Sequence, residues 1–317
     1  MRKVTFLVSC LLSIATAGVS AAPIQIPGFP QIPEELAQIN TEVRPKQEVC
    51  LAVNIPTRNC NLIGVLHLPN TLVPEGGFPT VMLFHGFRGT KFGGLAGAYR
   101  KLGRKLAAAG IATLRVDMAG CGDSEGFADE VSVATYLRDA QTILETVKQH
   151  PDLNEYRLGV AGFSLGCHTA FELAKIYTPS TSNIKALSLW APVADGGILL
   201  KELYESFCKH GQGDIVSIGK DFGFGPPPLI LCPGDAELFI RIQDHVTANS
   251  LPTKLYILHQ QGANDGLVSF THQMLFKNTA PGRMTFTIYP NTGHNLATSP
   301  NLDIILDEIV NHFQQIL

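Results

Sequence analysis

The sequence has little charge, a single tryptophan and no long uninterrupted apolar run after its first twenty residues. Charged residues make up 16% of the 317 residues, acidic residues (27) outnumber lysine and arginine (24), and the formal net charge is −3. Such a chain has no positive field to attract nucleic acid or an anionic membrane surface. We therefore expect neither as a partner, and we expect no helix that spans a membrane.

Metal-binding patterns are also missing. The sequence contains no C-x-x-C pair and no cluster of His and Cys at the spacing typical of zinc sites. We expect no metal ion and no other cofactor.

Cysteine is sparse, and six of the seven cysteines follow the N-terminal apolar stretch. An even number permits disulfides in an exported chain, but six cysteines allow fifteen pairings. Cys50 and Cys60 flank two predicted strands and are the best candidates for a local pair, and Cys208 and Cys232 could close one insertion. Cys167, on a predicted buried helix, reads as a packed thiol. The sequence assigns no pairing to the sixth cysteine, Cys121.

Residues 1–21 predict a signal peptide. Arg2 and Lys3 precede an apolar stretch that ends near Gly18, and Val19-Ser20-Ala21 offers the small residues of a cleavage site. A membrane anchor is the alternative, but this stretch of about fifteen residues is shorter than the roughly 20 needed to span a bilayer. We expect cleavage after Ala21 and export to the periplasm or the medium, with a proline-rich arm over 22–45.

Residues 46–317 predict one α/β domain. Two short β-like runs, 49–55 and 61–68, predict an antiparallel pair. Continuous apolar runs then alternate with segments of helical spacing, which indicates a mostly parallel central sheet with helices on both faces. The predicted strands are 80–86, 111–117, 156–163, 184–192, 253–261 and 283–290, and the predicted helices are 97–110, 133–150, 165–177, 238–250, 270–278 and 301–317.

This alternation fails after Pro192. Glycine and proline interrupt the pattern from about 193 to 237, which predicts a cap inserted into the α/β core.

Ser164 lies in a G-x-S-x-G pattern, between Gly162 and Gly166. The pattern alone is weak, because a glycine-rich chain produces it by chance. Here it follows a predicted buried strand and opens a predicted helix, which is the context of a nucleophile elbow. The hydroxyl would then stand above the carboxyl end of the sheet, where open α/β folds bind ligands. We predict Ser164 as a nucleophile.

A serine hydroxyl needs a base, and the base needs a carboxylate to orient it. His294 lies in a loop between the last predicted strand and the terminal helix, and Asp265 follows the preceding strand. Asp235 is a rival because it also follows an apolar run, but 59 residues separate it from His294, against 29 for Asp265. The 29-residue spacing accommodates one helix and one strand, so we favour Asp265.

The oxyanion of a tetrahedral intermediate needs hydrogen-bond donors. The segment HGFRG follows a predicted buried strand, and we predict the backbone amides of Phe87 and Leu165 as the pair of donors. Trp190 ends the strand before the cap, where it could line a substrate pocket or serve as a core aromatic.

These motifs resemble a known group of enzymes. HGFRG, RVDMAGCGDSEG, GFSLG and GANDGLV followed by GHN are similar to serine hydrolases of the α/β-hydrolase superfamily, in the serine aminopeptidase-like and monoacylglycerol-lipase-like group. The likeness covers roughly residues 49–317 and is strongest to bacterial cinnamoyl and feruloyl esterases. It implies an α/β-hydrolase fold and a loop-ordering role for Asp117. Leu165 departs from the polar residue often found there, and the cap cannot be aligned.

The resulting hypothesis is an exported serine esterase that acts on a small-molecule ester, of a short-chain or aromatic acid, through Ser164, His294 and Asp265. One alternative is a peptidase or amidase of the same fold, which would use the acidic cap residues Glu202, Glu205 and Asp214 to hold the substrate amine. Another is a catalytically silent binding protein, which would be expected to lack one of the three residues.

Overall fold

The computed structural model describes residues 48–57, 59–94, 96–177, 183–209 and 239–317. The predicted signal peptide, the proline-rich arm, Asp235 and most of the predicted cap lie outside these residues. Among the described residues, no helix has the length and apolar content needed to cross a bilayer.

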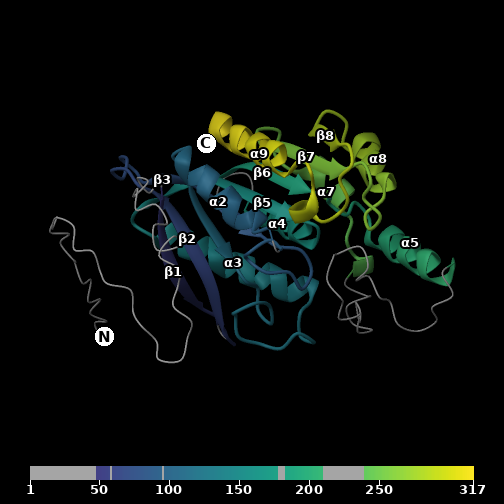
Figure 1. The fold of residues 1–317 in the computed structure, drawn as a ribbon, viewed down its shortest axis with the longest axis horizontal. Coiled ribbons are helices and arrows are strands. Elements are labelled where there is room, and N and C mark those ends of the chain that lie inside the picture. Colours follow the sequence, from purple (N-terminus) through teal and green to yellow (C-terminus); the bar gives the residue numbers. More distant parts are fainter. Residues whose placement is uncertain (1–47, 58, 95, 178–182, 210–238) are drawn as a thin grey trace, which may run out of the picture. The chain divides into compact units, whose positions relative to one another are not determined.

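An eight-stranded sheet forms the centre of the domain, with strand order β1-β2-β4-β3-β5-β6-β7-β8 (Figure 1). β2 pairs with β1 on one side and with β4 on the other in antiparallel fashion, and the five other neighbouring pairs are parallel. The antiparallel pair and the mostly parallel sheet are therefore as predicted. The strands are β1 Glu48–Pro56, β2 Asn61–Pro69, β3 Phe78–Phe84, β4 Ala112–Val116, β5 Leu153–Phe163, β6 Ile184–Trp190, β7 Tyr256–Gly262 and β8 Thr285–Tyr289.

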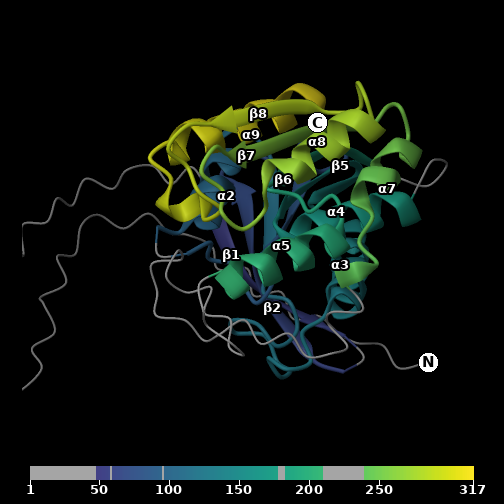
Figure 2. The same cartoon turned by 90° about the vertical axis from the view of Figure 1, so that its right-hand side faces the viewer.

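Helices cover both faces of the sheet (Figures 1 and 2). The apolar side chains of α2 and α9 form one buried cluster, and those of α3, α4 and α8 form another on the opposite face. Two buried layers of this kind explain why β3 and β4 read as continuous apolar runs. The helices are α2 Ala98–Ala108, α3 Val133–Gln149, α4 Leu165–Ile176, α5 Gly196–Lys209, α7 Asp244–Ser250, α8 Phe270–Thr279 and α9 Leu302–Ile316, with a 3₁₀ turn, η2, at Leu296–Thr298.

Local sequence signals set several helix ends. Ser132 and Thr135 form a reciprocal capping box at the start of α3, and α3 stops two residues before Pro151. Gly110 follows α2 in the left-handed region, with φ 83°, as expected of a helix-ending glycine.

The helix predicted over 238–250 is shorter: α7 begins only at Asp244. Phe239 and Ile240 are helical, but residues 241–243 are not, so the predicted helix is interrupted before α7.

The predicted Cys50–Cys60 disulfide is wrong. Cys50 pairs opposite His67 near one end of the β1–β2 hairpin, whereas Cys60 immediately precedes β2 at the other end. Extended chain of this length separates them by roughly 20 Å at about 3.3 Å per residue, far beyond the ~7 Å limit of a disulfide. Both are free thiols. The predicted partners Cys208 and Cys232 lie outside the residues whose side chains are described.

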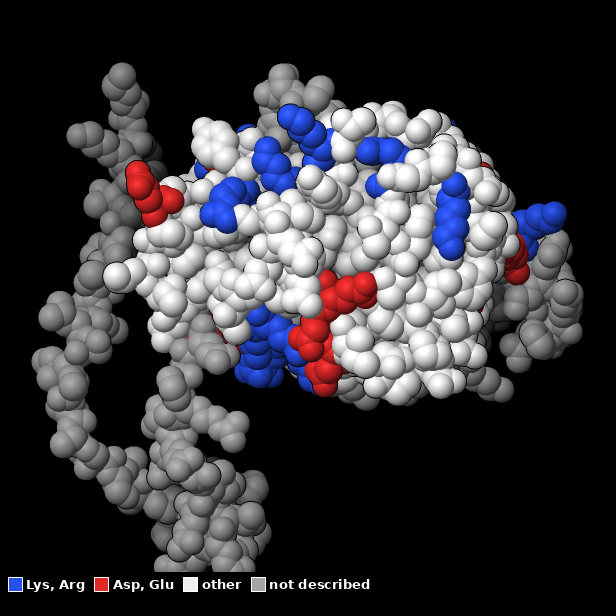
Figure 3. Space-filling model, turned by 90° about the horizontal axis from the view of Figure 1, so that it is seen from above, with Lys and Arg blue, Asp and Glu red and all other residues white. Residues whose placement is uncertain are grey.

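One face of the described surface carries little charge. Figure 3 shows one face, on which most of the described surface is uncharged. This agrees with the low charged fraction of the sequence.

Candidate active site

Ser164 occupies the sharp turn between β5 and α4. Its backbone has φ 55° and ψ −118°, in a region that non-glycine residues rarely occupy. The surrounding hydrogen bonds hold this conformation: the Ser164 amide donates to the carbonyl of Trp190 at 2.9 Å, and the Cys167 amide donates to the carbonyl of Ser164 at 2.9 Å. Strain that is held in this way is typical of functional positions.

The two glycines of the motif are required by close backbone approach. A Cβ at Gly162 would lie 2.6 Å from the carbonyl oxygen of Gly166, and one at Gly166 would lie 2.2 Å from that of Phe84. Real Cβ atoms do not approach backbone this closely. Only glycine therefore allows β3, β5 and α4 to converge at the serine.

Asp265 and His294 come together at the carboxyl end of the sheet, from the loops that follow β7 and β8. Nδ1 of His294 lies 3.0 Å from Oδ2 and 3.2 Å from Oδ1 of Asp265. The Asp265 side chain is fully buried, and the His294 side chain is 12% exposed. A carboxylate at Nδ1 favours the tautomer with the proton on Nδ1, which leaves Nε2 as an acceptor.

The segment HGFRG packs directly against the serine. A Cβ at Gly86 would lie 3.2 Å from Cβ and 3.8 Å from Oγ of Ser164, so the loop approaches closely. Leu165 is the first residue of α4, where an amide has no partner within the helix. Among the hydrogen bonds of the described residues, none is donated by the amide of Phe87 or of Leu165.

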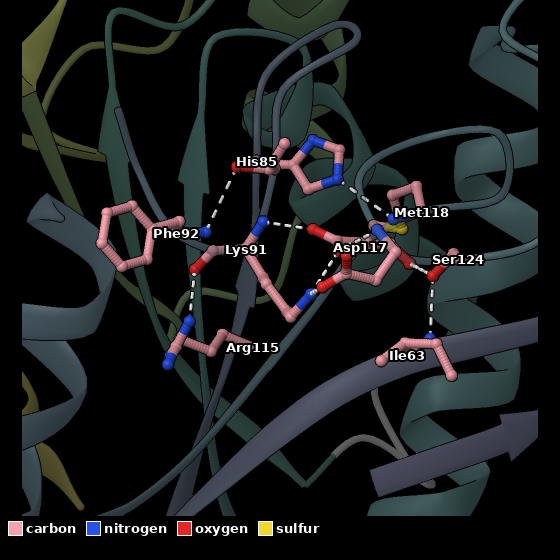
Figure 4. A network of polar contacts seen from close by, with 10 residues as sticks. Ile63, His85, Lys91, Phe92, Arg115, Asp117, Met118 and Ser124 are labelled. Carbon is pink, nitrogen blue, oxygen red and sulfur yellow. Dashed lines mark hydrogen bonds and ion pairs between the residues drawn. The ribbon is translucent and has the colours of Figure 1, made fainter. Parts of the chain in front are cut away.

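His85 and Tyr136 hold this loop in place. Nε2 of His85 accepts from the amide of Met118 at 3.0 Å (Figure 4). The ring therefore donates through Nδ1, which lies 2.8 Å from the carbonyl of Gly86. The Tyr136 hydroxyl donates to the same carbonyl at 2.8 Å and accepts from the amide of Arg88 at 3.1 Å. Burial lowers the pKa of His85. A neutral, fully buried histidine thus braces the loop.

Asp117 organises the neighbouring loop rather than facing the serine. Its buried carboxylate accepts from the backbone amide and the ammonium group of Lys91, and from the amide of Asp123 at 2.9 Å (Figure 4). Burial alone would lower the pKa of Lys91, but its hydrogen bonds and ion pairs with Asp117 and Asp123 outweigh burial and raise it. The ammonium group of Lys91 is therefore committed to these carboxylates.

Two groups of potential metal ligands occur among the described residues. The first combines Glu48, Cys50 and His67, where the guanidinium groups of Arg104 and Arg115 already bond to Glu48 and His67. Nearby positive charge disfavours a bound cation there.

The second group combines His168, Glu172 and Asp244. Nδ1 of His168 lies 2.7 Å from Oδ1 of Asp244, and Glu172 pairs with Lys175. A buried ion pair and an intrahelical ion pair account for these contacts without a metal ion. The expectation that the protein binds no metal stays a prediction.

The sequence did not reveal several of these contacts. The bonds made by Tyr136 and the pairing of His168 with Asp244 join positions that lie far apart in the chain and belong to no short motif. Trp190, predicted as a possible pocket residue, is 2% exposed and its indole Nε1 donates to the carbonyl of His294 at 2.8 Å.

Comparisons with known proteins agree with this architecture. Residues 78–209, which include Ser164 but neither Asp265 nor His294, match the family model of serine aminopeptidase S33. No curated protein is similar enough in sequence to match the chain.

Solved structures share the fold at low sequence identity. Est1E from Butyrivibrio proteoclasticus, solved with ferulic acid bound, has a TM-score of 0.63 and 19% identity, over 84% of this chain and 99% of that chain. The esterase domain of a Rhodothermus marinus protein has a TM-score of 0.60 and 16% identity, over 84% and 99%. A puromycin-hydrolysing peptidase of Mycobacterium tuberculosis has a TM-score of 0.63 and 16% identity, over 85% of this chain and 39% of that chain.

The sheet order and these neighbours show that the chain has the α/β-hydrolase fold, in agreement with the partial family match. Its neighbours include both esterases and peptidases.

Proposed function

We propose that the protein is an exported serine hydrolase that cleaves carboxylic esters. The observation that carries the proposal is the hydrogen bond between His294 and the buried Asp265, at the sheet edge that also bears the strained Ser164. A nucleophile on a strained turn and a histidine oriented by a carboxylate are the parts that acyl transfer requires.

The reaction follows from these positions. Nε2 of His294 takes the proton of the Ser164 hydroxyl as Oγ attacks the ester carbonyl. The amides of Phe87 and Leu165 stabilise the resulting oxyanion. The intermediate collapses to an acyl-enzyme as His294 protonates the departing alcohol, and water activated by His294 then releases the acid and restores the serine.

The best-supported substrates are esters of short-chain or aromatic acids. Phe87 and Phe239 form an edge-to-face aromatic pair 5.4 Å apart, next to the proposed oxyanion donor. Such a pair offers an apolar wall for an acyl group. The Est1E neighbour was solved with ferulic acid, an aromatic acid, although at this identity the likeness extends only to the fold.

Hydrolysis of p-nitrophenyl acetate and butyrate tests the proposal. The purified protein should hydrolyse both, and Ser164→Ala should abolish the activity, whereas Ser250→Ala should retain it as a matched control outside the site. Full activity of Ser164→Ala would remove this serine from the mechanism.

A peptidase or amidase is the second candidate, because the family match is to serine aminopeptidases and one neighbour hydrolyses puromycin. Such an enzyme would need a free acidic group for the substrate amine. Oε1 of Glu202 accepts from the hydroxyl of Ser269 at 2.7 Å, whereas Oε2 lies 3.6 Å from Nε2 of His272 and accepts no hydrogen bond among the described residues. Comparing naphthyl esters with aminoacyl-naphthylamides separates the two.

A further inference from the structure

Trp190 is connected to both sides of the proposed reaction. It is the last residue of β6, opposite Phe163 on β5 and Gln260 on β7. Its backbone carbonyl accepts from the amide of Ser164 at 2.9 Å and from the Cys167 thiol at 3.3 Å. The backbone of the proposed nucleophile is thus anchored on this one residue.

The side chain of Trp190 contacts the proposed base, His294. Its indole Nε1 donates to the backbone carbonyl of His294 at 2.8 Å, across 104 positions of sequence. The second anchor of His294 is the bond from its ring to Asp265. One hydrogen bond therefore holds the backbone of the proposed base and another holds its ring.

The indole of Trp190 is fixed by packing in the core and by the hydrogen bonds of the neighbouring backbone. Trp190 is 2% exposed, and its ring lies 6.0 Å from that of Tyr289. The next residue, Ala191, donates its amide to the carbonyl of Gln260 at 2.8 Å, so the backbone is tied on both sides. A packed ring on a central strand moves less than a loop does. Trp190 on β6 therefore ties the loop that carries His294 to the sheet.

We propose that Trp190 is a positioning residue that sets the distance between Ser164 and His294, through its carbonyl on one side and its indole N–H on the other. This inference rests on the proposed function. It assigns Trp190 to alignment of the two groups and not to substrate contact, because the ring is buried and its polar atom is already bonded. Misplacement of a catalytic group by about 1 Å lowers rates by about 100-fold.

The test removes the indole N–H and keeps an aromatic side chain at this position. Trp190→Phe leaves the carbonyl that holds Ser164 and deletes the donor to His294. Tyr289→Phe is the matched control, because it deletes a buried hydroxyl from the same aromatic group without touching Ser164 or His294. Replacement of Trp190 by 3-benzothienylalanine, which has sulfur in place of the N–H, provides a closer isostere if Trp190→Phe folds poorly.

The readouts are kcat and KM for p-nitrophenyl butyrate and the rate of labelling by a fluorophosphonate. We expect kcat and the labelling rate of both Trp190 variants to fall by about 10- to 100-fold with KM within twofold, and Tyr289→Phe to match the wild type. Unchanged kcat and labelling, or a rise in KM alone, would overturn the inference while leaving the proposed function intact. An inactive, unlabelled wild type would overturn both.

Discussion

Nδ1 of His294 lies 3.0 Å from Oδ2 of Asp265, while Oδ1 of the same carboxylate accepts from the amides of Leu267 and Val268 at 3.0 and 2.9 Å. Hydrogen bonds within its own loop thus hold the carboxylate of Asp265 independently of its contact with the histidine. A carboxylate held in this way can orient an imidazole without moving itself.

Removing the charge of Asp265 should therefore affect catalysis more than folding. We expect Asp265→Asn to lower kcat by about 10³- to 10⁴-fold, because the amide no longer selects the histidine tautomer. Asp235→Asn, the rival from the sequence, should keep near wild-type kcat, and circular dichroism should show both variants folded. The reverse ranking would assign the acid to Asp235.

Gly166 should not tolerate even a methyl group. The Cβ of Gly166→Ala would lie 2.2 Å from the carbonyl oxygen of Phe84, so the strand and helix must separate. We expect a loss of about 2 kcal/mol or more in the free energy of unfolding, measured with urea. A Cβ at Gly266 meets nothing within 4 Å, and Gly266→Ala should change it by less than about 0.5 kcal/mol. Equal stability of the two variants would contradict the close approach described at the elbow.

The brace beneath the proposed oxyanion loop can be tested at Tyr136. Tyr136→Phe keeps the ring but removes the hydroxyl that bonds to Gly86 and Arg88. Two backbone groups lose a partner, so we expect a loss of about 1–3 kcal/mol in stability. We also expect kcat for p-nitrophenyl butyrate to fall about tenfold, because a less fixed amide at Phe87 stabilises the oxyanion less well. Unchanged kcat would show that the brace serves folding alone.

Acid should destabilise the fold through a core histidine. Burial between Phe276 and Phe286 lowers the pKa of His259 to about 3, whereas an unfolded histidine titrates near 6.5. Between these values the unfolded chain binds the extra proton, so stability from this group is complete above about pH 6.5 and falls as pH drops toward 3.

The slope from one such group is about 1.4 kcal/mol per pH unit. We expect His259→Phe to flatten the dependence of unfolding free energy on pH between 6.5 and 4, relative to the wild type. His150→Gln, at the half-buried C-terminal end of α3, is the control and should leave the slope unchanged. Parallel curves for wild type and His259→Phe would contradict the prediction.

The sheet and most helices could be predicted because their signals are local. Buried parallel strands read as apolar runs, and caps such as Ser132 and Gly110 mark helix ends. The continuity of the helix over 238–250 and the Cys50–Cys60 pair were mispredicted, because apolar spacing and chain proximity do not determine backbone conformation or hairpin register.

The proposed site was predictable where one short motif carries the chemistry. Ser164, with its two glycines, is of this kind, and the loop positions of Asp265 and His294 follow from the order of the strands. The bond from Trp190 to His294 was not predictable. Its acceptor is a backbone carbonyl, which every residue has, so no side-chain pattern could mark it.

The most direct test of the account is to locate the adduct of a fluorophosphonate by peptide mass spectrometry. The account predicts a single modification on Ser164, which lies in the peptide that joins β5 to α4, and no modification of the Ser164→Ala variant. An adduct on another serine, or none in a folded wild-type protein, would contradict it.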